Sequence, residues 1–465
     1  MFEHYRVIHF TGIGGIGMSG IAEVLLNLGY EVTGSDLKES ETTERLRRSG
    51  AKIHIGHRPG NVAHAHVVVI SSAVSTDNIE VREARRRSIP VIPRAEMLAE
   101  LGRLKYSVLV AGAHGKTTTT SLISTVLAHA GLDPTAVIGG KLKAIGTNAK
   151  LGRGEFLVAE ADESDGSFLK LSPAIGVVTN IDREHMEFFK TMDALKEAFL
   201  SFMNKVPFYG VAVLCSDNEH IRQLLPLVHR RTLTYGLSKD AELRAHNIKR
   251  RGLSASFDVA LRGKNIGRFR LSMPGIHNIL NSLAAVAVAI ELRVGVKKIQ
   301  EALSGFEGIQ RRLEFKGRAK GVRFYDDYGH HPTEIRATVG ALKESFPKGR
   351  LHVIFQPHRY SRTKSLFEEF TGCFMDADAL YLMDIYPAGE KPIKGITSKA
   401  LYMEIKKAHA RVSHFADKEE LIGSVLSGLS AEDTVLTLGA GDVWKTGEQA
   451  ISRLMKQALS RGLKK

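Results

Sequence analysis

The sequence predicts an α/β protein of three domains, each built around a largely parallel sheet. Short apolar runs alternate with amphipathic, helix-like stretches along most of the chain, which is typical of βαβ units. Two of the apolar runs end in glycine-rich loops, at 12–17 and 112–115, where a strand would pass into a helix. The length of 465 residues also suggests about three domains at ~150 residues per domain.

The first domain is expected at 1–106. Its apolar strands end in a glycine loop or in small polar residues, and an amphipathic helix is expected at 21–28. The expected strands are 6–10, 31–33 and 66–70. This alternation of strand and helix implies parallel packing.

The second domain is expected at 107–312 and has two parts. The first part repeats the order of strand, glycine loop and helix, with the helix at 118–127. The second part alternates polar and apolar residues over 232–271, which predicts antiparallel hairpins, and continues into a helix at 279–292. The expected strands of the first part are 107–111, 156–159 and 175–178.

The third domain is expected at 313–465 and again alternates short apolar strands with helical stretches. This pattern predicts another doubly wound unit. Its expected strands are 322–325, 351–355, 379–383 and 434–438. The chain ends in a basic amphipathic helix at 451–465, which we interpret as a solvated helix rather than one lying on a membrane.

Composition narrows the class of partner. The formal charge of +15 favours acidic ligands, but the basic residues lack interleaved aromatic residues, so we expect phosphate-bearing small substrates rather than nucleic acid. No apolar run approaches the roughly 18 residues that span a bilayer, and no export signal is visible, so membrane insertion is not expected. The two cysteines, Cys215 and Cys373, are too few for a disulfide framework and fit the reducing cytoplasm.

The first glycine loop carries a nucleotide-binding fingerprint. Gly12, Gly14 and Gly17 match G-x-G-x-x-G, with Gly15 between them. The glycines let the backbone approach a pyrophosphate, whose negative charge the following helix N-terminus favours. Asp36 ends the next strand, where a carboxylate accepts a hydrogen bond from a ribose hydroxyl. At this point the pyrophosphate belongs either to NAD or to another nucleotide.

The second glycine loop predicts a nucleoside triphosphate site. Its lysine suits the β and γ phosphates, its threonine suits Mg²⁺, and its backbone N–H groups cradle phosphate oxygens. Only two residues separate Gly112 from Gly115, which departs from the usual G-x-x-x-x-G-K-[ST]. The loop residues are Gly112, Ala113, His114, Gly115, Lys116, Thr117 and Thr118.

Polar runs close the next two strands of the second domain, at 160–165 and 179–185. Because the carboxyl ends of parallel strands meet beside the phosphate loop, carboxylates there would hold Mg²⁺ that bridges the nucleotide phosphates. Glu160 begins the first run and His185 ends the second. We expect His185 to reach the same crevice as a second metal ligand.

Two similar runs follow strands of the third domain, at 325–332 and 356–363. Arg359 and Arg362 in the later run suit the recognition of carboxylate or phosphate. His330 in the earlier run would position a reacting group. Metal binding by the adjacent pair His330 and His331 is disfavoured, because neighbouring residues rarely face one site.

With these motifs the chain resembles the Mur ligase family over all three predicted domains. The shortened phosphate loop is the form that this family uses, and the first fingerprint becomes a site for the diphosphate of a UDP-sugar. The resemblance implies an N-terminal Rossmann-like UDP-binding domain, a central P-loop-type ATP-binding α/β domain and a C-terminal Rossmann-like domain. It is carried by GIGGIGMSG (12–20), GAHGKTTT (112–119), EADESDGSF (160–168), TNIDREH (179–185), HNILN (277–281), DDYGHHPTE (326–334) and QPHRYSRT (356–363).

The resemblance further implies an ATP-dependent amide-forming ligase of cytoplasmic peptidoglycan precursor synthesis. The L-alanine-adding branch is the most similar, so the implied substrates are UDP-N-acetylmuramate, L-alanine and ATP. ATP would phosphorylate the lactyl carboxylate, and the amine of L-alanine would then displace phosphate from the acyl phosphate. Two Mg²⁺ ions are expected, with Mn²⁺ as an alternative, and the protein would be a monomer or a weak dimer.

By this resemblance Lys116 stabilises the transferring phosphoryl group, while Thr117 and Glu160 hold one Mg²⁺ and His185 holds a second. Asn278 and Asn281 would face adenine, and Asp327 would lie near its ribose. His330, Arg359 and Arg362 would face the muramoyl and amino-acid side, with the C-terminal domain closing over the nucleotide. The implied UDP-sugar site consists of Gly12, Gly14, Gly15, Gly17, Asp36, Ser71 and Ser72.

One departure from the family pattern accompanies this interpretation. Several relatives carry a carbamylated lysine about 14 or 15 residues after the metal-binding histidine, but this chain has Ala198, Phe199 and Leu200 there, with Lys196 nearby. We therefore do not predict a carbamylated lysine.

Three alternative functions stand beside this interpretation. They are a ligase that recycles an intact peptide onto the same UDP-sugar, an NAD-dependent oxidoreductase built on the first loop, and a non-enzymatic nucleotide-regulated binding protein.

Overall fold

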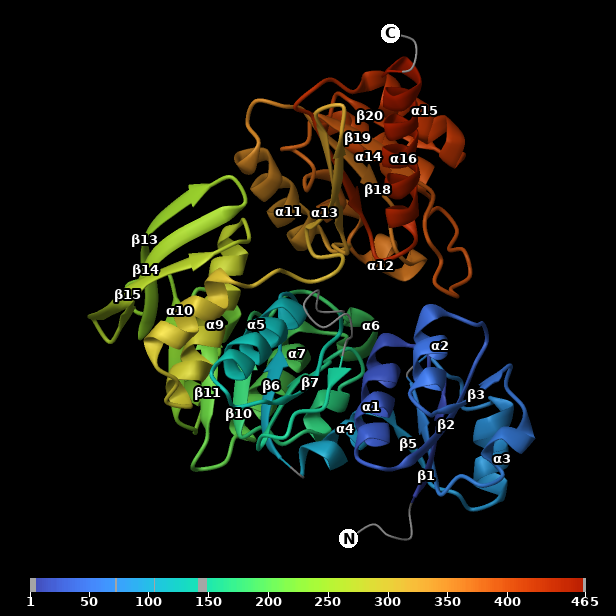
Figure 1. Ribbon diagram of the computed structural model, residues 1–465, viewed down its shortest axis with the longest axis vertical. Helices are drawn as coiled ribbons and strands as arrows, with labels where there is room; N and C mark the ends of the chain where they lie inside the picture. Colours follow the sequence, from blue (N-terminus) through green and yellow to red (C-terminus); the bar gives the residue numbers. More distant parts are fainter. Residues whose placement is uncertain (1–5, 72, 104, 141–148, 463–465) are drawn as a thin grey trace. The chain divides into compact units, whose positions relative to one another are not determined.

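The computed structural model describes residues 6–71, 73–103, 105–140 and 149–462 (Figure 1). The chain divides into two compact units. The first unit contains residues 1–248, 256–271 and 278–307, and the second contains 249–255, 272–277 and 308–465. Each unit is described by itself below, and the boundaries at 106 and 312 stay predictions.

The first unit begins with a five-stranded parallel sheet in the order β3-β2-β1-β4-β5. Its strands are β1 (Val7–Thr11), β2 (Glu31–Asp36), β3 (Lys52–Ile55), β4 (Val67–Ile70) and β5 (Val91–Pro93). Its helices are α1 (Ile16–Asn27), α2 (Glu41–Arg48), η1 (Pro59–Val62), α3 (Ile79–Arg86) and α4 (Arg94–Gly102). The three predicted strands are confirmed, and the carboxyl ends of all five lie at one edge of the sheet.

Helix α1 begins at Ile16, five residues before the predicted start at 21. Gly17 and Gly20 weaken the helical signal of this turn, because glycine is a poor helix former. Met18 and Ser19 are nevertheless buried, and Ser19 N–H donates to Gly15 O at 2.9 Å. Tertiary packing therefore extends the helix back to the glycine loop.

A ten-stranded sheet lies mostly in the first unit, in the order β15-β14-β13-β12-β11-β10-β6-β9-β7-β8, with 249–251 of β13 and 254–255 of β14 assigned to the second unit. The strands are β6 (Tyr106–Ala111), β7 (Thr135–Val137), β8 (Ala149–Lys150), β9 (Phe156–Glu160), β10 (Ile175–Val178), β11 (Val211–Cys215), β12 (Thr232–Gly236), β13 (Leu243–Arg251), β14 (Ser254–Leu261) and β15 (Lys264–Leu271). The helices are α5 (Lys116–His129), η2 (Ser167–Lys170), α6 (Met186–Phe189), α7 (Met192–Asn204), α8 (Glu219–Leu224), η3 (Leu225–Leu227), α9 (Ile276–Glu291) and α10 (Val296–Ser304). Strands β6, β9 and β10 and helices α5 and α9 confirm the predicted elements.

The prediction of antiparallel hairpins over 232–271 is wrong for its first strand. β12 pairs in parallel with β11 and with β13, so it continues the parallel sheet. Strands β13, β14 and β15 are neighbours joined by two-residue connections, which only antiparallel hairpins allow. The error arose because one alternating pattern runs through both regions and carries no information about strand direction.

The second unit contains a six-stranded sheet in the order β16-β17-β21-β18-β19-β20, in which β16 alone is antiparallel. Its strands are β16 (Glu314–Ala319), β17 (Val322–Asp327), β18 (Leu351–Phe355), β19 (Ala379–Met383), β20 (Val412–Phe415) and β21 (Thr434–Leu438). Its helices are α11 (Pro332–Ser345), α12 (Tyr360–Ser365), α13 (Phe367–Thr371), α14 (Ser398–Ala408), α15 (Lys418–Gly428) and α16 (Val443–Gly462). The four predicted strands are confirmed, whereas the polar edge strand β16 was not predicted.

Two hydrophobic clusters cover opposite faces of this sheet. Phe355 packs with residues of α11, α13 and α14, whereas its neighbour Ile354 packs with residues of α15 and α16. In Figure 1, α11 and α13 lie on one side of this sheet and α15 and α16 on the other. Successive strand residues point to opposite faces, so burial on both sides produces the continuous apolar runs seen in the sequence. Helix α16 begins eight residues before the predicted 451, because its first turns belong to this core.

Within the described ranges, no helix combines the length and the apolar character that crossing a membrane requires.

Candidate functional site

The phosphate loop connects β6 to α5 and depends on two glycines. Gly112 has φ +136° and Gly115 has φ +80°, in the region that side-chain-bearing residues rarely adopt. A Cβ on Gly112 would collide with Thr179 Oγ1, and one on Gly115 would lie 2.5 Å from Asn281 Oδ1. Both glycines are therefore required by backbone conformation and by close neighbours, one directly after β10 and one in α9.

Lys116, the first residue of α5, points its ammonium group back into the loop. Nζ donates to the carbonyl oxygens of Gly112 and of Ala113, the latter at 3.2 Å, and to Glu163 Oε1 at 2.8 Å. Burial by itself would lower the pKa of Lys116, but the nearby carboxylates, led by Glu163, outweigh burial and raise it. A permanent positive charge thus lies where backbone N–H groups would receive phosphate oxygens.

An acidic cluster lies beside this lysine. Glu163, Glu184 and His185 each offer one ligand atom within 4.8 Å of the others. Glu163 is 1% exposed, and its Oε2 has no hydrogen-bond partner among the described residues. Two carboxylates, one with an unused buried oxygen, and an imidazole fit a divalent cation such as Mg²⁺ or Mn²⁺.

The titration of this cluster reflects burial and charge together. Burial raises the pKa of Glu163, although Lys116 acts in the opposite direction. Burial would lower the pKa of His185, but the carboxylates of Glu187, Glu184 and Glu163 outweigh it and raise the pKa. His185 has a left-handed φ of 57°, so the loop holds this residue in an unfavourable conformation where its ring faces the acids.

Two other predicted metal ligands have different surroundings. Glu160 accepts a hydrogen bond from the Gly139 N–H at 2.5 Å and is absent from the cluster around His185 within the ranges described. Thr117 is buried in the first turn of α5, where its carbonyl accepts from Ser121 Oγ at 2.7 Å. The assignments of Glu160 and Thr117 to a metal stay predictions.

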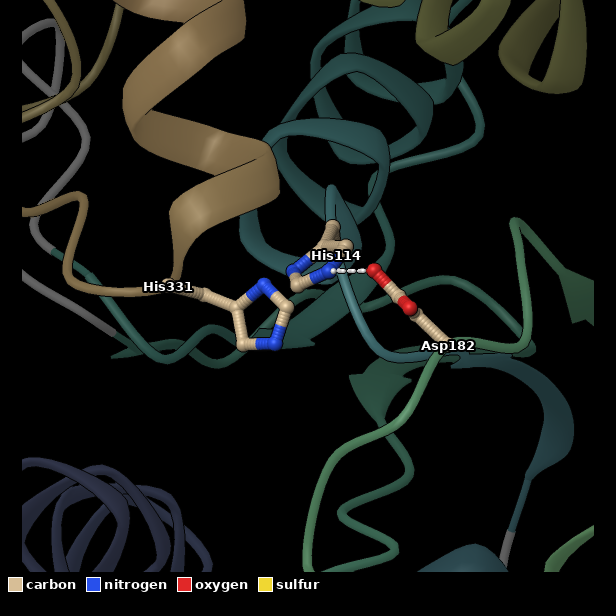
Figure 2. Close-up of side chains that lie close together, drawn as sticks. All are labelled: His114, Asp182 and His331. Atoms are coloured by element: carbon tan, nitrogen blue, oxygen red, sulfur yellow. Dashed lines mark hydrogen bonds and ion pairs between the residues drawn. The ribbon is translucent and has the colours of Figure 1, made fainter. Parts of the chain in front are cut away.

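The histidine of the phosphate loop is held by the second polar run. The main-chain N–H of His114 donates to Asn180 Oδ1 at 2.8 Å, and Asn180 Nδ2 donates to His114 O at 2.9 Å. Figure 2 shows the imidazole against the carboxylate of Asp182, with Nε2 and Oδ2 2.8 Å apart. Asn180 and Asp182 thus fix the backbone and the side chain of His114, respectively.

Two asparagines of α9 lie next to the same loop. Asn281 Oδ1 accepts from Thr119 Oγ1 at 3.2 Å, and its Nδ2 donates to Asn278 Oδ1 at 3.3 Å. Both amides are buried. The structure therefore places the predicted adenine contacts against α5, the helix that carries the phosphate loop; their role toward adenine stays a prediction.

The first glycine loop is organised by Asp36. Its Oδ2 accepts from the N–H of Gly14 and its Oδ1 from the N–H of Leu37, both at 2.8 Å. Gly12 has φ +81°, and Ser71 Oγ lies 3.7 Å from the position that a Cβ on Gly12 would occupy. Asp36 thus holds the loop itself, and its proposed contact with a ribose stays a prediction. Ser72 lies outside the described residues.

An arginine links the first glycine loop to the first polar run of the central sheet within the first unit. The guanidinium of Arg94, at the start of α4, lies so close to Gly17 that a Cβ there would displace it. Arg94 Nη2 also pairs with Asp162 Oδ2 at 3.0 Å. Burial raises the pKa of Asp162, but Arg94 and Lys116 outweigh it and lower the pKa to about 2.

In the second unit, Asp327 ends β17 and His330 follows it. Asp327 accepts from the N–H groups of Leu313 at 2.6 Å and Gly329 at 2.7 Å, and burial raises its pKa to about 6. His330 Nδ1 lies 3.0 Å from Tyr328 O. Asp327 therefore ties the residue before β16 to the turn after β17, and its predicted role near a ribose stays a prediction.

The predicted arginines flank a histidine that sequence analysis did not assign. Arg362 Nη1 lies 3.3 Å from His358 Nδ1, and the rings of His330 and His358 are 5.9 Å apart. Burial and the charges of His330 and Arg362 lower the pKa of His358 to about 3, so this imidazole is neutral. Arg359 has φ +69°, and its N–H donates to Tyr386 O at 2.8 Å.

Three models of one family together match most of the chain. They are described as Mur ligase family, catalytic domain (residues 7–106), Mur ligase middle domain (110–289) and Mur ligase, glutamate ligase domain (311–441). The chain is also 57% identical over 456 residues to the UDP-N-acetylmuramate–L-alanine ligase of Geobacter sulfurreducens, covering 98% of this chain and 99% of that one.

The chain belongs to the Mur ligase family.

Other relatives agree with this membership. The UDP-N-acetylmuramate–L-alanine ligase of Syntrophobacter fumaroxidans is 54% identical, covering 99% of each chain. The crystal structure of the UDP-N-acetylmuramate–alanine ligase from Thermotoga maritima has a TM-score of 0.83 at 28% identity and covers 97% of this chain and 99% of that chain. A murein peptide ligase from Psychrobacter arcticus has a TM-score of 0.71 at 22% identity, covering 97% and 98%, and shows the fold alone. The three-domain α/β fold and the ligase class are thereby established for this Mur ligase.

Apart from Arg94, the site residues that sequence analysis missed lie inside the motifs it had singled out. Glu163 belongs to the first polar run, and Asn180, Asp182 and Glu184 belong to the second. The pattern indicates that the ends of β9 and β10 meet the phosphate loop, but it does not indicate which side chains turn inward. Arg94 had no sequence signal, because a single arginine after a short strand is common.

Proposed function

We propose that this Mur ligase joins L-alanine to the lactyl carboxylate of UDP-N-acetylmuramate, with conversion of ATP to ADP and phosphate. The observation that carries the proposal is the position of Lys116, whose partly buried ammonium lies in the glycine loop and against Glu163. The L-alanine ligases that cover nearly the whole chain at 54–57% identity support the choice of substrates.

The chemistry follows from the poor reactivity of a carboxylate. A lactyl carboxylate oxygen attacks the γ-phosphorus of ATP, the bond to the β–γ bridging oxygen breaks, and an acyl phosphate and ADP result. The amine of L-alanine then attacks the acyl carbon, loses a proton, and expels inorganic phosphate as the amide forms. Negative charge gathers on the transferring phosphoryl group, so a fixed cation contributes more to the transition state than to the ground state.

We propose that Lys116 and the glycine loop stabilise the negative charge that develops on the phosphoryl group in the first step. The glycines let backbone N–H groups approach the phosphates, and Asn180 preorganises the loop by holding both the N–H and the carbonyl of His114. Asn278 and Asn281 would fix the orientation of the nucleotide base. Asp182 would keep the His114 ring in one orientation at the edge of the loop.

The residues that would hold a divalent cation are Glu163, Glu184 and His185. A bound Mg²⁺, or Mn²⁺, would neutralise phosphate charge and stabilise the leaving group. The unused oxygen of Glu163 supports this assignment. Glu160 and Thr117 stay candidates for one of the two ions that we expect.

The first unit would bind the UDP moiety at the loop of Gly12, Gly14, Gly15 and Gly17, with Asp36 and Ser71 at its borders. In the second unit we propose that His330, Arg359 and Arg362 recognise the anionic muramoyl and amino-acid groups. We also propose that the enzyme acts in the cytoplasm as a monomer or weak dimer, without nucleic acid or membrane partners.

The test is phosphate release from ATP by the purified full-length protein, with UDP-N-acetylmuramate and Mg²⁺. We expect release with L-alanine as acceptor and none without an acceptor. Release only with L-Ala-γ-D-Glu-meso-diaminopimelate would reassign the protein to peptide recycling. No release with either acceptor would contradict the proposal, and detection of the UDP-N-acetylmuramoyl-L-alanine product by mass spectrometry would identify the bond formed.

A further inference from the structure

A fully buried carboxylate, Glu80, lies in the N-terminal sheet region and has no part in the chemistry proposed above. It is the second residue of α3 and is 0% exposed. Its Oε2 accepts from Ser35 Oγ at 2.6 Å and from Thr11 Oγ1 at 2.9 Å. Its Oε1 accepts from Asn61 Nδ2 at 2.6 Å and from the Arg58 N–H at 3.3 Å.

These hydrogen bonds reach the residues that carry the first glycine loop. Thr11 directly precedes Gly12, and Ser35 directly precedes Asp36. The carbonyl of Ser35 also accepts the N–H groups of Gly12 at 2.8 Å and Ile13 at 3.0 Å. Glu80 therefore ties together the ends of β1 and β2, from which the glycine loop and its carboxylate project.

The same carboxylate holds the segment after β3. Asn61 Nδ2 donates both to Glu80 and to Gly56 O, the latter at 3.1 Å, which closes the loop around His57. His57 Nδ1 lies 2.9 Å from Ser35 Oγ and 3.4 Å from Glu80 Oε2. With Nδ1 engaged and the side chain 16% exposed, Nε2 is the nitrogen left to meet a ligand at the carboxyl edge of the sheet.

Glu80 stays ionised in this environment. Burial raises the pKa of this carboxyl group, but hydrogen bonds from His9, Ser35 and Asn61 outweigh burial and lower it to about 2. A buried charge with this many donors is costly to rearrange, because each donor would lose its partner. The network therefore gives the strand ends one fixed geometry.

We infer that Glu80 is a positioning residue of the UDP-binding site, which fixes the glycine loop after β1, Asp36 after β2 and His57 after β3 in the arrangement that receives the uridine diphosphate. This inference rests on the proposed function, because it takes the first glycine loop as a UDP site. Glu80 itself lies beneath the site and does not touch the ligand.

The test measures binding of UDP, and separately of ATP, to the full-length protein by isothermal titration calorimetry. Glu80→Gln keeps the size of the side chain but removes its charge and turns one oxygen into a donor. We expect the Kd for UDP to rise about ten-fold, the equivalent of about 1.4 kcal/mol, while the Kd for ATP changes less than about two-fold. If Glu80 only stabilised the fold, Glu80→Gln would weaken the binding of UDP and the binding of ATP to the same extent.

Asp433→Asn is the matched control. Asp433 is also a buried carboxylate, 3% exposed, and it accepts from the N–H groups of Arg350 and Ser430 and contacts His352 Nε2 at 3.2 Å. It belongs to the second unit, whereas the first glycine loop belongs to the first. We expect this variant to lose thermal stability and to keep wild-type affinity for UDP.

Three results would overturn the inference: unchanged UDP affinity in Glu80→Gln, parallel loss of UDP and ATP affinity in that variant, or an equal loss of UDP affinity in Asp433→Asn. If Glu80→Gln does not fold, Asn61→Ala provides a second test, because it removes only the link to the loop around His57. This variant should still raise the Kd for UDP several-fold. Failure of the wild-type protein to bind UDP would instead contradict the proposed function, and the inference with it.

Discussion

The two glycine loops of the first unit share one topology and differ in charge. Each leaves the carboxyl end of a parallel strand and enters a helix, at Ile16 in α1 and at Lys116 in α5. The first loop is held by the carboxylates of Asp36 and, through the strand ends, Glu80. The second loop is held by Asn180, and its lysine faces the acidic cluster.

This difference supports the proposal that the first loop binds its ligand while the second also takes part in catalysis. Both loops offer backbone N–H groups and a helix N-terminus to phosphate oxygens. Of the two loops, the second adds a partly buried ammonium and a set of carboxylates that fits a cation, the groups that stabilise charge during phosphoryl transfer. We therefore propose that the side chain at the start of the helix, rather than the fold, decides which task a loop performs.

The largest effect is expected from Lys116→Ala. Removing the ammonium should lower kcat for L-alanine-dependent phosphate release by about 10²–10³-fold, because one preorganised charge donor is lost from the transition state. UDP affinity should stay within two-fold of the wild type, since the first loop is intact. A variant that keeps more than a tenth of the wild-type kcat would contradict the division of tasks between the loops.

Glu163→Gln and Glu160→Gln compare two acids of the same polar run. If the cation lies at Glu163, Glu184 and His185, Glu163→Gln should raise the Mg²⁺ concentration for half-maximal activity by about 10–100-fold. Glu160→Gln should raise it less, because Glu160 is hydrogen-bonded to Gly139. A Mg²⁺ titration of both variants measures this, and a larger effect of Glu160→Gln would favour the original assignment.

Alanine substitutions test the backbone conformation of the two glycine loops. Gly112→Ala forces a side chain into φ +136° and against Thr179, which should cost about 1–3 kcal/mol and raise the KM for ATP. Gly14→Ala meets the Asp36 carboxylate at 2.8 Å and should raise the KM for UDP-N-acetylmuramate while leaving the KM for ATP unchanged. Steady-state kinetics with each substrate varied in turn would measure both KM values. A raised KM for UDP-N-acetylmuramate in Gly112→Ala, or a raised KM for ATP in Gly14→Ala, would argue against separate sites.

The smallest effect concerns the pH dependence of stability around the first loop. The folded-state pKa of Glu80, about 2, lies below its usual 4.5, so its contribution is present above pH 4.5 and is lost as the pH falls toward 2. The melting-temperature difference between the wild type and Glu80→Gln should therefore be largest near pH 7 and should shrink below pH 4.5. A difference that stays constant across this range would show that the charge of Glu80 does not stabilise the fold.

Sequence patterns predicted the strands best where both faces are buried. The apolar runs that became β6, β10 and β18 were located within a residue of their observed ends, because no polar face interrupts them. Polar edge strands such as β16 and the start of α1 were missed or shortened, because local residues there favour neither element strongly. The direction of β12 was wrong because direction depends on connections rather than on local pattern.

The chain's own motifs determined the three-domain α/β class, the two phosphate-binding loops and the acidic strand ends beside the second loop. Glycine spacing and strand-to-helix turns are local, so one sequence suffices to locate them. Only the tertiary structure decided that Glu163 rather than Glu160 faces Lys116, that Asp36 turns onto its own loop, and that Glu80 braces three strand ends. Those choices depend on side-chain directions and on contacts between residues far apart in the chain, which are set by packing and the satisfaction of buried charge.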